Sequence, residues 1–157
     1  MREIGTVGEY VLIEDGFWVG TKNKDGRICV SPDLHYRDIL DFKDGIAIAV
    51  QEVKGYREFK WGLIDECGDH VSDFKYDYVT VWGEGYYRCD IGARNNILRR
   101  EGTEVLSEWF NSIHKVVKEY FTFSNTIRKS KKNGSVTNCM GNIHENYHKL
   151  LTLQYEK

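Results

Sequence analysis

The chain is poor in the features that mark several large protein classes. Pro32 is its only proline, and no stretch approaches the run of about 20 apolar residues that a membrane helix needs. The formal net charge is only −2, which argues against a strongly basic nucleic-acid surface or attraction to acidic membranes. The first residues show no basic segment followed by an apolar one, so we expect a cytoplasmic protein without a secretory signal.

Cysteine is also scarce, and its spacing excludes the common cysteine-based sites. The four cysteines are Cys29, Cys67, Cys89 and Cys139. No two of them are close enough in sequence to form a zinc knuckle or a redox pair. We therefore expect reduced, mostly buried thiols, as in a cytosolic protein.

Glycine and aromatic residues, in contrast, are abundant. There are 15 glycines and 10 tyrosines, and aromatic residues make up 13% of the chain. This combination with almost no proline is typical of strands joined by glycine turns. The length of 157 residues, with 41% hydrophobic and 29% charged residues, predicts one globular domain over residues 1–157.

A short aromatic or polar motif recurs along the chain at intervals of roughly 35–40 residues. Each copy of the motif follows a turn glycine at a similar distance. The copies begin at Tyr36, Tyr76, Phe110 and Tyr147, and the glycines are Gly26, Gly68, Gly102 and Gly141. The pattern predicts degenerate repeat units at about 17–50, 60–89, 94–125 and 133–155.

Within a unit the hydrophobic pattern favours strands. Ile46, Ile48 and Val50 alternate with Ala47 and Ala49, which is the period of two expected for a β-strand. The fold class we predict is mainly β, built from tandem antiparallel β-hairpin repeats. A solenoid-like and a propeller-like twisted sheet both fit this pattern.

Two segments indicate helix instead. Ser107 to Val117 places apolar residues at helical spacing. The stretch from about 143 to 155 begins with a sequence like a capping box and continues with an apolar helical stripe. We expect a C-terminal helix there that covers the open end of the array.

One stretch resembles a known family. The residues are Lys60-Trp61-Gly62-Leu63-Ile64-Asp65, then Gly68, Tyr76-Asp77 and Gly85. In this order they resemble the bacterial WG repeat, also called the KWG repeat. Residues 94–125 depart from it, with Asn95-Asn96 for Trp-Gly and Phe110-Asn111 for Tyr-Asp, and residues 17–50 have Val19-Gly20. The resemblance implies a bacterial β-hairpin repeat protein, and the family pattern carries no catalytic residues.

The residues that carry the resemblance have a plausible packing role. Tryptophan offers a large apolar surface to a neighbouring hairpin, and glycine lets another backbone approach closely. We interpret the motif as structural rather than catalytic. Its members are Trp61, Gly62, Gly68, Tyr76, Asp77 and Gly85.

One motif could carry chemistry. His144-Glu145-Asn146-Tyr147-His148 spells H-E-x-x-H, which on a helix places His144 and His148 as zinc ligands beside Glu145 as general base. The metzincin continuation is missing, because Leu151 and Gln154 stand where glycine and histidine are required. A zinc-dependent hydrolase is therefore the alternative function, and coincidence on an exposed helix is favoured.

The main functional hypothesis is a non-catalytic scaffold that binds a protein partner and needs no cofactor. Repeat scaffolds bind through long surfaces formed by equivalent positions of neighbouring units. Candidate contact residues are Asp44, Trp82, Glu84 and Lys118, which the pattern places in or near loops. Membrane and nucleic-acid partners are disfavoured by the charge balance.

Overall fold

The computed structural model describes residues 1–53, 58–83, 85–117, 120–128 and 135–138, with side chains as far as residue 111. The described residues form antiparallel strands, one short 3₁₀ helix and no α-helix. Twelve of the thirteen described strands form four consecutive blocks of three. These are β1 Arg2–Val7, β2 Tyr10–Asp15 and β3 Trp18–Lys22; β5 Tyr36–Lys43, β6 Ile46–Val53 and β7 Glu58–Asp65; β8 Tyr78–Gly83, β9 Tyr86–Ile91 and β10 Arg94–Arg99; and β11 Ser112–Val117, β12 Tyr120–Arg128 and β13 Ser135–Asn138.

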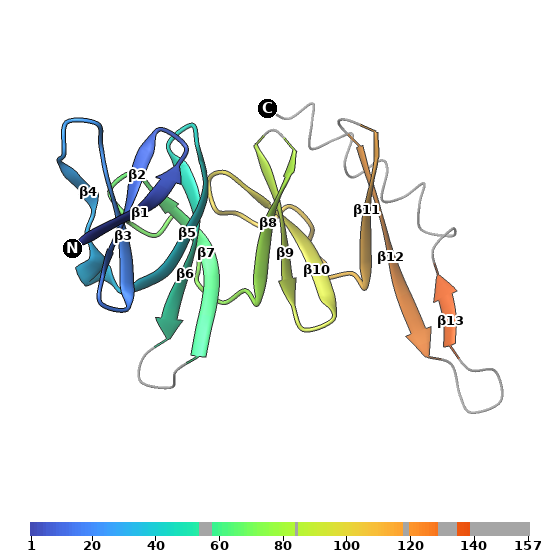
Figure 1. Cartoon of the computed structure of the whole chain (residues 1–157). Helices are drawn as coiled ribbons and strands as arrows, with labels where there is room; N and C mark the ends of the chain where they lie inside the picture. Colours follow the sequence, from blue (N-terminus) through green and yellow to red (C-terminus); the bar gives the residue numbers. More distant parts are fainter. Residues whose placement is uncertain (54–57, 84, 118–119, 129–134, 139–157) are drawn as a thin grey trace.

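The first two blocks, together with β4, form one seven-stranded antiparallel sheet in which β3 pairs with β5, whereas β8–β10 and β11–β13 each form a three-stranded sheet. The blocks follow one another from left to right in Figure 1. After the third strand the chain makes a turn and runs back along that strand. We call these stretches the return segments, and they span residues 23–35, 66–77 and 100–111. The first contains β4 Ile28–Val30 and the 3₁₀ helix Pro32–Leu34. The described residues are mostly strands and every strand pairing is antiparallel, so the mainly antiparallel β prediction is confirmed. No closed barrel forms among the described strands.

The prediction of a helix over Ser107–Val117 is wrong. Residues 112–117 form β11, which pairs antiparallel with β12 from Ser112↔Ser124 to Val117↔Tyr120. A cross-strand partner satisfies the backbone in the extended form, and this tertiary pairing overrides the helical spacing of the sequence. The proposed helix at 143–155 lies outside the described residues.

At one matching place, the third strand of each of the first three blocks bridges to a residue just before or at the start of the next block. In the second block, Trp61 N–H donates to Tyr76 O at 2.8 Å, and Tyr76 N–H donates to Trp61 O at 3.4 Å. Asn95 N–H donates to Phe110 O at 2.6 Å in the next block. The three bridged pairs are Val19↔Tyr36, Trp61↔Tyr76 and Asn95↔Phe110. These three bridges join positions that the sequence aligns.

The hydrophobic core lies between the blocks rather than within one. In the second block, Ala49 and Ile64 pack toward the first block, whereas Ile48 and Leu63 pack toward the third. Alternate residues of a strand point to opposite faces, so this block is buried on both sides. Three core clusters follow one another along the array.

Two of the turn glycines, Gly68 and Gly102, sit against the preceding return segment. A Cβ on Gly68 would lie 2.7 Å from Leu34 Cδ1, and one on Gly102 would lie 2.0 Å from the Val71 carbonyl oxygen. Both glycines have a φ of +87°, a conformation that favours glycine. Successive blocks therefore meet through the same kind of contact. No helix in the described part of the chain is long and apolar enough to cross a membrane.

Candidate functional site

The motif glycines have structural roles. A Cβ on Gly62 would lie 2.6 Å from the Phe74 ring, so this ring of the return segment packs directly on the strand backbone. Gly85 has a φ of +75° in the β8–β9 turn. Together with Gly68, these positions need glycine for close approach or for backbone conformation.

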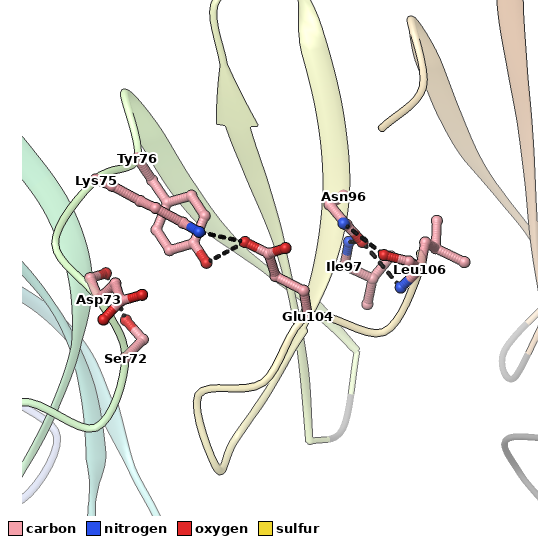
Figure 2. Close-up of polar contacts among 8 residues, drawn as sticks. All are labelled: Ser72, Asp73, Lys75, Tyr76, Asn96, Ile97, Glu104 and Leu106. Carbon is pink, nitrogen blue, oxygen red and sulfur yellow. Dashed lines mark hydrogen bonds and ion pairs between the residues drawn. The ribbon is translucent and has the colours of Figure 1, made fainter. Parts of the chain in front are cut away.

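Tyr76 joins two return segments. Its side chain is 1% exposed, and its hydroxyl donates to Glu104 Oε1 at 2.9 Å. The Lys75 ammonium lies 2.9 Å from the same carboxylate oxygen, as Figure 2 shows. Burial, and then the hydrogen bond to Glu104, raise the pKa of the Tyr76 hydroxyl. Tyr36, at the matching place, donates to the Gly68 carbonyl at 2.6 Å.

In the third block, Asn96 occupies the position that matches the motif glycine Gly62. Its fully buried amide donates to Leu106 O at 3.0 Å and accepts from Leu106 N–H at 3.1 Å (Figure 2). In the third block the Asn96 amide thus pairs with the return segment. At the matching position of the second block, Gly62 leaves room for the Phe74 ring of its return segment. Buried polar groups need such partners, so Asn96 is structural.

Asp77 belongs to a small charged network at the start of β8. Its carboxylate accepts from Gly92 N–H at 2.7 Å and pairs with Lys60 at 2.7 Å. Lys60 also lies 3.0 Å from Glu58. The Gly92 N–H, and then Lys60, hold the pKa of the Asp77 carboxyl below its usual range. The hydrogen bonds to Asp77 and Glu58 raise the pKa of Lys60.

Trp61 is half-buried and belongs to an exposed cluster of rings. Its ring centroid lies 4.8 Å from that of Tyr78. Tyr78 is 48% exposed, and Phe59 is 37% exposed two residues before Trp61 on β7. We call Phe59, Trp61 and Tyr78 the aromatic patch. It lies at the beginnings of β7 and β8, which are at the lower side of Figure 1.

This patch was not among the contact residues expected from the sequence. Asp44 lies in the β5–β6 turn and is exposed, at the opposite ends of the strands from the aromatic patch. Trp82 is half-buried on β8, and Glu84 and Lys118 lie outside the described residues. Phe59 and Tyr78 look like ordinary strand residues in the sequence, so alternation alone could not reveal their exposure.

No group of three or more His, Cys, Asp or Glu side chains within the described residues is arranged to hold a metal. Cys89 is fully buried, and burial raises the pKa of its thiol to about 12, so it is a poor nucleophile. His144, Glu145 and His148 lie outside the described residues, and the hydrolase alternative stays a prediction from the sequence.

Comparison with known proteins adds no relative. No family model, no curated protein and no solved structure matches the chain. Function must therefore be argued from the geometry of the patch and from the way the blocks join.

Proposed function

We propose that this chain is a non-catalytic cytoplasmic scaffold of WG-type hairpin repeats that binds a partner protein through the aromatic patch. The observation that carries the proposal is the exposure of Tyr78 beside the half-buried Trp61. Tyrosine and tryptophan are enriched among the residues that dominate binding energy at protein interfaces. Exposed rings grouped in this way mark interaction sites more often than single exposed apolar residues do.

The repeat character of the scaffold is part of the proposal. It is supported by the three matching bridges between the third strands and the residues that lead into the next block. The turn-glycine contacts of Gly68 and Gly102 support it as well. Such blocks cannot bury both faces alone, so stacking supplies their core. A scaffold of this kind holds its surface rings in place without any cofactor.

The test compares partner recovery by matched variants in cells that naturally produce the chain. The patch variant combines Phe59→Ala with Tyr78→Ala. The control is Val81→Ala, because Val81 is 47% exposed on the same strand as Tyr78. Quantitative mass spectrometry should find a protein retained by the wild type and by the control but lost from the patch variant.

Equal recovery by the patch variant and the wild type would contradict the proposal. Far-UV circular dichroism should show the same β-sheet spectrum for all three proteins. The exposed side chains contribute little to the core, so unfolding cannot explain a selective loss of binding.

A further inference from the structure

The strand registers align the first three blocks residue by residue. The bridged residues Val19, Trp61 and Asn95 share one position, and the strand pairings extend the match from there. In the second and third blocks, four matching positions face the preceding block, and we call the face that carries them the leading face. They are Ile39, Ala47, Ala49 and Ile64 in the second block, Val79, Tyr87, Cys89 and Leu98 in the third, and Glu3, Val11, Ile13 and Lys22 in the first.

The leading faces of the second and third blocks are apolar and covered. All eight of their residues are at most 6% exposed. Those of the second block belong to the core cluster shared with the first block, and those of the third belong to the cluster shared with the second. Each of these two blocks therefore stacks on its predecessor through its leading face.

The first block carries charge at two of the four positions. Glu3 stands where the second block has Ile39, and Lys22 stands where it has Ile64. The Lys22 ammonium pairs with the Glu3 carboxylate. Because Glu3 lies on β1 and Lys22 on β3, the ion pair reaches across β2 between them. It thus crosses the part of the leading face that stays apolar.

The apolar part of this face is covered from within the block. Ile13 is 2% exposed, and its cross-strand partner is Gly20. A Cβ on Gly20 would lie 2.2 Å from the Val30 carbonyl oxygen and 2.9 Å from Pro32 Cδ. Cross-strand partners share a face, so the first return segment lies on the leading face beside Ile13. The first block therefore buries Ile13 without a neighbouring block.

We propose that the Glu3–Lys22 ion pair closes the leading face of the first block against a second copy of this chain. Stacking a copy there would take both charges out of water, and desolvation of an ion pair can exceed the attraction between its charges. Repeat arrays need such polar outer faces on their terminal units to stay soluble. The inference goes beyond the proposed function, because Phe59, Trp61 and Tyr78 lie on the opposite faces of β7 and β8 from the leading-face residues Ile64 and Val79.

The test gives the first block apolar residues at both charged positions. In a variant with Glu3→Ile and Lys22→Ile, the leading face should pair with the same face of a second copy, as in a two-fold dimer. Analytical ultracentrifugation should show a weight-average mass that rises with concentration toward twice that of the chain. The wild type should show no such rise. The milder pair Glu3→Gln and Lys22→Met should give a smaller rise in the same direction.

Two matched variants locate the association. Arg2→Ile with Glu14→Ile removes the other ion pair of β1 and β2, whose atoms lie 2.6 Å apart, and adds two isoleucines on the opposite face. This control should sediment as the wild type does. Thr6→Lys places a charge on the leading face, since Thr6 is the exposed cross-strand partner of Val11. Added to the Glu3→Ile, Lys22→Ile variant, it should restore the wild-type mass.

Three results would overturn the inference. The first is a mass that stays at the wild-type value in both variants that remove the Glu3 and Lys22 charges. The second is an equal rise in the Arg2→Ile, Glu14→Ile control, which would show that any two added isoleucines suffice. The third is association of the wild type that Thr6→Lys abolishes, because the leading face would then already bind a second copy.

Discussion

Gly102→Ala should destabilise the protein by about 3 kcal/mol or more, whereas Gly26→Ala should cost only about 1 kcal/mol. Both glycines occupy a turn after the third strand of a block, with φ of +87° and +85°. Both substitutions therefore carry the cost of a left-handed alanine. Only at Gly102 would the new Cβ also meet a backbone atom, the Val71 carbonyl oxygen at 2.0 Å.

Gly68→Ala should cause a loss of stability between those of Gly26→Ala and Gly102→Ala. Its new Cβ would meet the Leu34 side chain at 2.7 Å, and a side-chain end can move where a carbonyl cannot. Urea unfolding at one temperature measures the series, with circular dichroism as the signal. An equal loss at Gly26 and Gly102 would show that the turn does not press on the preceding return segment.

Tyr76→Ala should cost about 3–5 kcal/mol, because it empties a buried aromatic site and removes a hydrogen bond. Tyr76→Phe keeps the ring and should cost about 1–2 kcal/mol, since Glu104 retains Lys75 as a partner. The matched control is Tyr78→Ala, two residues further on. Its ring is 48% exposed, so the loss should stay below about 1 kcal/mol.

Thermal unfolding distinguishes the three variants, because 1 kcal/mol lowers the midpoint by about 2–4 °C in a domain of this size. A midpoint lowered as much by Tyr78→Ala as by Tyr76→Ala would contradict this account.

Tyr76 should also make the protein less stable in alkali. The pKa of its hydroxyl is raised in the folded state. Its contribution to stability is therefore complete below the ordinary tyrosine pKa of about 10 and is lost as the pH rises above that value.

The sequence predicted local structure well where pattern and turn chemistry agree. Ile46 to Val50 alternate strictly and form β6, and Gly68 and Gly102 were recognised as turn residues. A few apolar residues in Ser107–Val117 fall at helical spacing, which favours a helix. The pairing of β11 with β12 decided the structure of residues 112–117 instead.

The sequence pattern does not predict the contacts between blocks. Nothing in the pattern connects Tyr76 with Glu104, because that bond depends on how two return segments pass each other. Asn96 stands in the third block where the motif has Gly62, and its amide pairs with the return segment of its own block, which the sequence pattern does not indicate. Exposure of Tyr78 depends on how the neighbouring block packs beside β8, which a single strand pattern does not encode.

Photo-crosslinking from the patch tests the central claim most directly. A benzoylphenylalanine in place of Tyr78, introduced into the chain in its natural host, should give a crosslinked product of discrete mass after irradiation. Phe59→Ala in the same protein should abolish that product. The same photoreactive residue in place of Lys43, exposed at the opposite ends of the strands, should give none. A product from position 43 without one from position 78 would contradict binding through the aromatic patch.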